Sequence, residues 1–230
     1  MLDLSKIKAI SFDLDDTLWP VWPAIYRAED VLLQWLQTHA PATAQRYPST
    51  EALRALRVQL EAERPDLRYD LSAMRRESIR LALRQSGDDG DLAEPAFEVF
   101  FAARQQVDFY DDALPALERL AARFPLVALS NGNADVQRVG IGQHFRAAFS
   151  AHVFGAAKPD PRIFHAAAQS VGVAPHEVLH VGDDALLDVV AAVDAGMQAV
   201  WLNRQGHAWA HPTQPHLTVT ELGALCALWP

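Results

Sequence analysis

Short, unbroken apolar runs that alternate with longer helical stretches are the feature that most restricts how this chain can fold. Runs without polar interruption are typical of strands buried on both faces, and their alternation with helices is typical of a parallel sheet. The runs are "IKAISF" at 7–12, "PLVALS" at 125–130, "AHVFG" at 151–155, "EVLHV" at 177–181 and "QAVWL" at 198–202. We therefore predict an α/β fold with a Rossmann-like parallel sheet.

The segment between the first and second runs has a different pattern. Leu53, Leu56 and Leu60 recur at helical spacing there, and no comparable apolar run interrupts them. We predict helices at about 23–39, 50–63, 71–86 and 92–107. The chain is thus expected to start a sheet, leave it for a helical insertion and return. The predicted domains are an α/β core at 1–19 and 108–230 and an all-helical domain at 20–107.

Polar and charged residues follow four of the predicted strands. In open α/β sheets, ligands bind outside the carboxyl ends of the strands, so we expect these residues to converge at one edge. They are Asp13, Asp15, Asp16 and Thr17 after the first strand, Ser130 and Asn131 after the second, Lys158 after the run at 151–155, and Asp183, Asp184 and Asp188 after the fourth.

Each of these residues also has an ordinary structural explanation. Asp and Thr are common in turns and at helix N-caps, and Asn131-Gly132 is a good hairpin signal. The residues after Gly132 do not alternate like a returning strand, which argues against the hairpin. Asp160-Pro161 predicts the start of a helix and needs no lysine before it. It is the combination, at four strand ends, that favours a functional site.

So many aspartates in one place require cations. Two like unit charges about 4 Å apart repel by about 4 kcal/mol at an effective dielectric constant of 20. Carboxylate oxygens suit Mg²⁺, which keeps several waters and bridges to phosphate, and Lys158 supplies a second positive charge. We therefore expect Mg²⁺ as the cofactor.

These residues resemble the motifs of the haloacid dehalogenase (HAD) superfamily. The stretch Asp13-Leu14-Asp15-Asp16-Thr17 is similar to its first motif, Asp-x-Asp-x-Thr, and Ser130 to its second. Lys158 is similar to the third motif, and Gly182-Asp183 with Asp188 to the fourth. The insertion resembles the helical cap of these proteins, so the resemblance covers the whole chain.

Two longer stretches look like a narrower branch of that superfamily. They are "PLVALSNGNA" and "LHVGDDALLDVVAAVDAGMQAVW". The branch includes a bacterial phosphatase of riboflavin biosynthesis, which acts on 5-amino-6-(5-phospho-D-ribitylamino)uracil and related flavin nucleotides. This resemblance implies a small phosphorylated metabolite as the substrate.

The resemblance to the superfamily implies a role for each motif residue. Asp13 would attack phosphorus and form an aspartyl-phosphate, and Asp15 would protonate the leaving oxygen and later activate water. Asp13, the Asp15 carbonyl and Asp183 would hold Mg²⁺. Phosphate-binding residues would be Thr17, Ser130, Asn131 and Lys158, with Asp188 and Asp184 in support; Asp16 and Asp184 could equally cap helices.

Asp15 favours phosphoryl transfer over dehalogenation. A halide leaves without a proton, whereas an alkoxide is a poor leaving group and needs a general acid. Family dehalogenases lack an acid at this place. The alternatives are a phosphomutase acting on a sugar phosphate, a 2-haloacid dehalogenase and a catalytically idle phosphate-binding module.

The helical domain is expected to select the substrate by closing over the site. Trp19, Trp22 and Tyr26 lie where the chain enters it and could stack on a flat ring. Their alternative role is hinge and core packing. Arg75 and Arg76 could reach a charged group of the substrate or belong to a solvated helix face.

Charge and composition exclude some classes of partner. The 230 residues include 20 basic and 29 acidic ones, a formal net charge of −9 that argues against a nucleic-acid or anionic-membrane surface. One cysteine, Cys226, allows no disulfide within the chain, which fits a reducing compartment. No signal peptide or membrane-spanning run is evident. We therefore expect a cytoplasmic monomer or homodimer.

Overall fold

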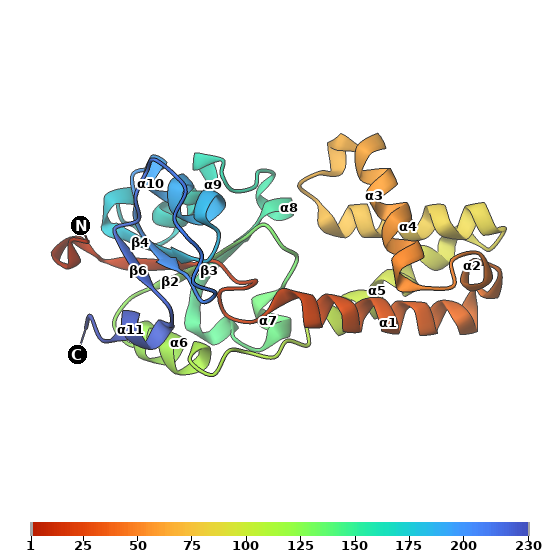
Figure 1. Cartoon of the computed structure of the whole chain (residues 1–230), viewed down its shortest axis with the longest axis horizontal. Coiled ribbons are helices and arrows are strands. Elements are labelled where there is room, and N and C mark those ends of the chain that lie inside the picture. The colour runs from red at the N-terminus through yellow and green to blue at the C-terminus, as the bar shows by residue number, and fades with distance from the viewer. Residues whose placement is uncertain (1, 230) are drawn as a thin grey trace. The chain divides into compact units, whose positions relative to one another are not determined.

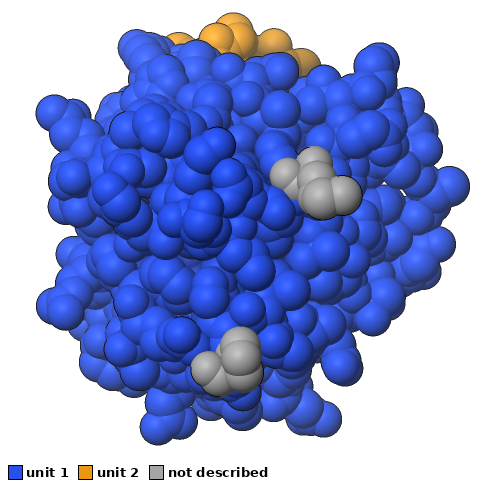
Figure 2. Space-filling view, turned by 90° about the vertical axis from the view of Figure 1, so that its left-hand side faces the viewer, with its two compact units in different colours: residues 1–20, 108–230 blue, residues 21–107 orange. Residues whose placement is uncertain are grey.

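The computed structural model describes residues 2–229. Contacts between residues divide the chain into two compact units, which Figure 2 colours separately. The unit of residues 1–20 and 108–230 is called the core below, and the unit of residues 21–107 is called the cap. No helix among the described residues is long and apolar enough to cross a membrane.

The core is built around one six-stranded sheet in the order β3-β2-β1-β4-β5-β6. Figure 1 shows helices on both sides of this sheet. The strands are β1 (Ala9–Phe12), β2 (Leu126–Ser130), β3 (Phe145–Ser150), β4 (Val178–Gly182), β5 (Gln198–Leu202) and β6 (Leu217–Val219). All neighbouring strands run parallel. The chain proceeds from β1 to one edge of the sheet and then returns to the other side of β1. Such a switch point opens a crevice at the carboxyl ends of the strands.

Burial of the inner strands confirms the predicted α/β fold. Every residue of β1, β2, β4 and β5 is buried, as expected of a parallel sheet covered on both faces. A core cluster joins strand residues such as Val127 and Leu129 with Ile163 and Phe164 of the helix α9.

The predicted strand at 151–155 is wrong. Ala151–Phe154 forms a short helix, α8, which ends at Gly155 with a left-handed φ of 79°. The strand lies just before it, as β3. Because β3 is an edge strand with partly exposed residues, such as Arg146, it lacks an unbroken apolar run. The short edge strand β6 was not predicted for the same reason. The helix after it, Leu222–Cys226, was not predicted either.

Helices cover the sheet of the core. They are α6 (Ala113–Ala121), α7 (Val136–Val139), α8, α9 (Pro161–Ser170), α10 (Ala191–Asp194) and α11 (Leu222–Cys226), with the π-helix η6 (Ala185–Val190) and the 3₁₀ turns η1 (Leu4–Lys6), η4 (Gly142–His144) and η5 (Pro175–Glu177). The start of α9 is as predicted: Asp160 caps it by accepting a hydrogen bond from the Arg162 N–H, and Pro161 follows.

The cap is entirely helical and has its own apolar centre. Its helices are α1 (Val21–His39), α2 (Pro41–Arg46), α3 (Thr50–Glu63), α4 (Leu71–Ser86) and α5 (Ala93–Arg104), with the 3₁₀ turns η2 (Pro65–Leu67) and η3 (Gly90–Leu92). Leu32 and Leu36 of α1 pack with Phe97 and Phe100 of α5. Three predicted helices are close to their observed bounds. The fourth ends at Arg104 rather than 107, and the short α2 was not predicted.

Candidate active site

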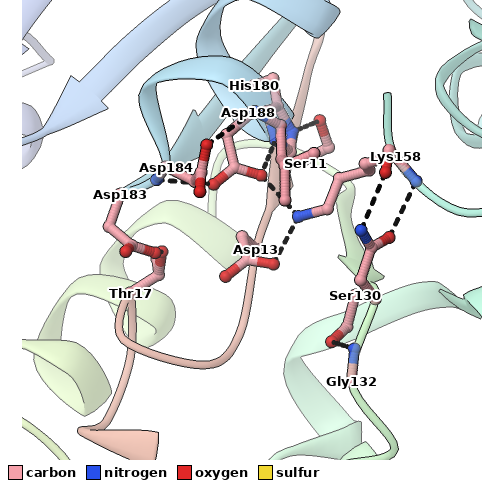
Figure 3. A network of polar contacts seen from close by, with 12 residues as sticks. Ser11, Asp13, Thr17, Ser130, Gly132, Lys158, His180, Asp183, Asp184 and Asp188 are labelled. Carbon is pink, nitrogen blue, oxygen red and sulfur yellow. Dashed lines mark hydrogen bonds and ion pairs between the residues drawn. The ribbon is translucent and has the colours of Figure 1, made fainter. Parts of the chain in front are cut away.

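The carboxyl ends of β1 and β4 bring aspartates against a buried lysine (Figure 3). The Nζ atom of Lys158 lies 2.5 Å from Oδ1 of Asp13 and 2.5 Å from Oδ1 of Asp188. Lys158 exposes only 4% of its surface. Burial lowers its pKa, but the two carboxylates outweigh burial and raise the pKa above the ordinary value. Lys158 is therefore a fixed positive charge.

Negative charge still exceeds positive charge in this cluster. Burial raises the pKa of Asp13 well above its ordinary value; Lys158 opposes this, and Asp188 and Asp183 raise it further. Burial also raises the pKa of Asp183 to about 7, and Asp188 adds to the effect. A further cation would stabilise the ionised forms of these carboxyl groups.

The oxygens of the cluster fit a divalent metal ion. Asp13, Asp183 and Asp188 each offer one oxygen, and these atoms all lie within 4.8 Å of one another. Hard oxygen ligands on one side, with room for waters on the other, suit Mg²⁺. Both oxygens of Asp188 already accept hydrogen bonds, Oδ1 from Lys158 and Oδ2 from the Asp184 N–H. Asp13 and Asp183 are therefore the better candidates to hold the ion.

Two hydrogen bonds hold Asp183, one at its carboxylate and one at its backbone carbonyl. The hydroxyl of Thr17 donates to Asp183 Oδ1 over 3.0 Å, and the indole Nε1 of Trp201 donates to the Asp183 carbonyl over 2.8 Å. Thr17 is fully buried. The Thr17 hydroxyl therefore helps to orient Asp183, and its expected contact with phosphate stays a prediction.

The end of β2 supplies Ser130 and a tie to Lys158. The Ser130 hydroxyl oxygen accepts a hydrogen bond from the Gly132 N–H over 2.9 Å. The amide of Asn131 pairs with the backbone of Lys158, donating to its carbonyl over 2.9 Å and accepting from its N–H over 2.8 Å. The Asn131 side chain thus positions Lys158.

A cavity of about 170 Å³ opens at this edge of the sheet. It is lined by Asp13, Asp15, Asp16, Ser130, Asn131, Gly132, Lys158, Asp183, Asp184, Leu187 and Asp188. The structure therefore brings together residues from all four predicted strand ends. Its walls carry carboxylates, one lysine and the loop after β2, which is the combination that a phosphate group with a metal ion needs.

Asp16 and Asp184 have clear structural tasks. Asp16 adopts a left-handed backbone conformation, with φ of 61°, and its N–H donates to the Trp19 carbonyl over 2.7 Å. The Asp184 carboxylate accepts hydrogen bonds from the Leu186 and Leu187 N–H groups over 2.8 and 2.7 Å. Asp184 is thus an N-cap, one of the two roles considered for it.

His180 and Ser11 were missed by the sequence reasoning. They are register partners on β4 and β1, and Nδ1 of His180 lies 2.8 Å from the Ser11 hydroxyl. Nε2 of His180 lies 3.3 Å from Asp188 Oδ1. Burial lowers the pKa of His180, against the effect of Asp188. The available signal was one polar residue inside each of two otherwise apolar strands.

The aromatic residues at the entrance to the cap divide into two groups. Trp19 has no exposed surface, so its ring offers no face for stacking on a substrate. Trp22 and Tyr26 of α1 are 53% and 49% exposed and stack on each other with ring centroids 5.5 Å apart. The Arg54 guanidinium lies 5.3 Å from the Tyr26 ring centroid and pairs with the buried Glu29.

The buried Arg75 of α4 is occupied inside the cap. Its guanidinium lies 3.1 Å from Glu29 and 4.2 Å from the ring centroid of Phe100. Burial lowers its pKa to about 10, which leaves it charged at neutral pH. Arg76 pairs with Glu94 at 2.9 Å and lies over Phe97. Both arginines therefore have partners within the cap.

Comparisons with known proteins identify the family of this chain. The haloacid dehalogenase-like hydrolase family model matches residues 7–196. The 5-amino-6-(5-phospho-D-ribitylamino)uracil phosphatase YigB of Escherichia coli is 34% identical over 98% of this chain and 97% of its own. The phosphoserine phosphatase of Thermus thermophilus is 35% identical over 63% of this chain and 60% of its own.

Solved structures show the same fold. A crystal structure described as a 2-haloacid dehalogenase from Pseudomonas syringae pv. Tomato DC3000 has a TM-score of 0.89 at 39% identity, covering 97% of this chain and all of that one. The family match spans most of this chain, and phosphatases are among its relatives. The chain belongs to the haloacid dehalogenase-like hydrolases and is a phosphoric monoester hydrolase of that family.

Proposed function

We propose that this protein is a Mg²⁺-dependent phosphatase that works through an aspartyl-phosphate on Asp13. The observation that carries the proposal is the pairing of Asp13 with Lys158 in a cavity that Asp15 also lines. Mg²⁺, held by Asp13 and Asp183, would neutralise charge on the phosphoryl oxygens. The remaining chemistry belongs to the side chains of this chain.

The proposed reaction has two displacements at phosphorus. An Asp13 oxygen forms a bond to phosphorus while the ester P–O bond breaks, and its electron pair leaves with the ester oxygen. Asp15 transfers a proton to that oxygen. In the second displacement Asp15 takes a proton from water, the water oxygen bonds to phosphorus and the Asp13–phosphorus bond breaks. Ser130 and Lys158 hold the phosphoryl oxygens during both displacements.

A variant of Asp13 tests the intermediate. Acid-quenched wild-type enzyme incubated with labelled substrate should retain covalently bound phosphate, and Asp13→Asn should retain none and turn over no p-nitrophenyl phosphate. Asp111→Asn, at an exposed aspartate of the core, is the control and should behave like the wild type. Wild-type turnover by Asp13→Asn would rule out this nucleophile.

For the substrate, we propose a flavin-type or ribitylaminouracil phosphate. The support is the similarity to YigB over nearly the full length of both chains, together with the exposed aromatic pair Trp22–Tyr26 in the cap. Stacked rings with a nearby guanidinium suit a flat heterocycle, because aromatic and cation–π contacts both favour it.

A panel of metabolite phosphates assayed with Mg²⁺ tests this choice. Flavin mononucleotide or the ribitylaminouracil phosphate should have the highest kcat/KM. Trp22→Ala should raise KM for that best substrate and leave KM for p-nitrophenyl phosphate unchanged. Val58→Ala, which truncates another exposed apolar residue of the cap, is the control. Preference for sugar phosphates with no flavin activity would contradict the substrate choice.

A second candidate activity is 2-haloacid dehalogenation. The structural similarity to a protein described as a 2-haloacid dehalogenase favours it, and Asp15 argues against it because a halide needs no proton. Chloride release from (S)-2-chloropropionate tests for this activity. We expect none, whereas chloride release that Asp13→Asn abolishes would add a dehalogenase activity to the phosphatase.

A further inference from the structure

We propose that Trp19 is a positioning residue that holds the carboxyl group of Asp15 for proton transfer to the leaving group. The inference rests on the acid role of Asp15 in the proposed function and adds the groups that orient this acid. Indole Nε1 of Trp19 donates to Asp15 Oδ1 over 2.8 Å. An indole N–H is only a donor, and a fully buried one requires an acceptor. In this structure that acceptor is the Asp15 carboxyl.

Gly132 confines the same carboxyl from the other side. A Cβ atom at position 132 would lie 2.3 Å from Asp15 Oδ2 and 3.1 Å from the Ser130 hydroxyl oxygen. Any side chain at this position would therefore displace the carboxyl. Trp19 holds Oδ1, and Oδ2 rests against the backbone of the loop that also carries Ser130.

The loop between Asp15 and Trp19 keeps the indole in place. The Asp16 N–H donates to the Trp19 carbonyl over 2.7 Å, and the Leu18 N–H donates to the Leu14 carbonyl over 2.8 Å. The Trp19 ring meets Phe109 edge to face, with centroids 5.5 Å apart and planes at 84°. The donor is thus fixed within the core, on the same short loop as the acid that it holds.

This arrangement places the transferable proton on one atom. Oδ1 accepts the indole hydrogen, so the acid proton belongs on Oδ2. During the first displacement that proton moves to the ester oxygen as the P–O bond breaks and its electron pair moves onto that oxygen. Without the indole donor the carboxyl can take other orientations. The acid proton then points at the ester oxygen in a smaller fraction of enzyme–substrate complexes, and proton transfer is slower.

Leaving-group dependence separates positioning from a structural role. Aryl phosphates from 4-nitrophenyl to phenyl phosphate are similar in size but differ in how basic the leaving oxygen is. 4-Nitrophenolate leaves readily without a proton, whereas phenolate needs one. For Trp19→Phe, kcat/KM should fall by about ten-fold or more with phenyl phosphate and by less than about three-fold with 4-nitrophenyl phosphate. Phe109→Leu is the matched control, since it disturbs the packing of the ring and keeps the N–H.

If Trp19 has only a structural role, Trp19→Phe will lower kcat/KM by the same factor for every aryl phosphate, as we expect for Phe109→Leu. That result would overturn the inference. Asp15→Asn must show the same selectivity. If Asp15→Asn is selective and Trp19→Phe is not, only the positioning role fails. If Asp15→Asn lowers kcat/KM by the same factor for all the aryl phosphates, Asp15 is not the acid, and the inference fails with that role. Should Trp19→Phe not fold, benzothienylalanine at position 19 replaces only the N–H by sulfur and must give the same selectivity.

Discussion

At the scale of single residues, the site depends on one cation that serves two carboxylates. Lys158 contacts Asp13 and Asp188, and all three are buried. Asn131 holds the backbone of Lys158, and His180 and the Asp184 N–H hold Asp188. Removing one member of such a group leaves the others buried without compensation, which costs more than the intact pair contributes.

Lys158→Met should therefore destabilise the protein as well as abolish activity. We expect the free energy of unfolding to fall by about 3–5 kcal/mol, because two buried carboxylates lose their cation. The double variant Lys158→Met/Asp188→Asn should regain part of this loss, since one of those charges is removed. Urea unfolding in EDTA measures both.

A matched surface variant controls for the loss of a lysine. Lys6 pairs with Asp3 at 3.1 Å, and both side chains are largely exposed. Lys6→Met should leave the urea midpoint unchanged, because exposed ion pairs are screened by water and salt. If Lys158→Met/Asp188→Asn is less stable than Lys158→Met alone, loss of charge compensation does not explain the effect of Lys158→Met.

At the scale of elements, short loops after the strands place the chemistry. The loop after β1 makes a tight return in which Asp16 takes the left-handed conformation. The loop after β2 carries Gly132, whose missing side chain makes room for Asp15. Each loop directly follows a strand that is buried along its whole length. The packed strand therefore fixes the position from which the loop starts.

Substitutions of Asp16 test this conformation. Glycine tolerates a positive φ without steric cost, so Asp16→Gly should keep most of the stability. Asp16→Val should lower it by about 1–3 kcal/mol, because a β-branched residue is strained in the left-handed region. Thermal unfolding of the two variants measures the difference. Equal stability of Gly and Val at this position would show that the loop takes another conformation in solution.

At the scale of the whole molecule, apolar side chains pack separately in the core and in the cap. One described cluster joins strands of the sheet with α9, and another lies among the helices of the cap. The candidate metal ligands all belong to the core. The metal ion should therefore stabilise the core directly, because binding to the folded state shifts the unfolding equilibrium.

Mg²⁺ should raise the unfolding temperature of the wild-type protein. At a free concentration about 100 times Kd the stabilisation is about 2.7 kcal/mol. Asp183→Asn should lose this shift, because a carboxylate ligand becomes a neutral amide. Asp194→Asn, at an exposed acid of α10, should keep it. An equal shift in Asp183→Asn would remove Asp183 from the metal site.

Much of this organisation was predictable from local patterns. The inner strands are mostly apolar because both of their faces are buried, so β1, β2, β4 and β5 were predicted close to their bounds. The edge strand β3 was misplaced onto α8, because an edge strand exposes residues such as Arg146 and lacks that pattern. The helices of the cap, except for the short α2, followed from the helical spacing of apolar residues and from the breaks between them.

The sequence by itself determined the fold class and which residue types stand at the strand ends, because both depend on neighbours along the chain. Only the tertiary structure decided their partners. Trp19 holds Asp15 rather than facing a substrate, Thr17 serves Asp183, and His180 joins Ser11 to Asp188. The Thr17–Asp183 and Ser11–His180 hydrogen bonds join residues 166 and 169 positions apart, and the second pair faces across neighbouring parallel strands. These partners could not be predicted from neighbours along the chain, because they meet only when distant strands pair in the sheet.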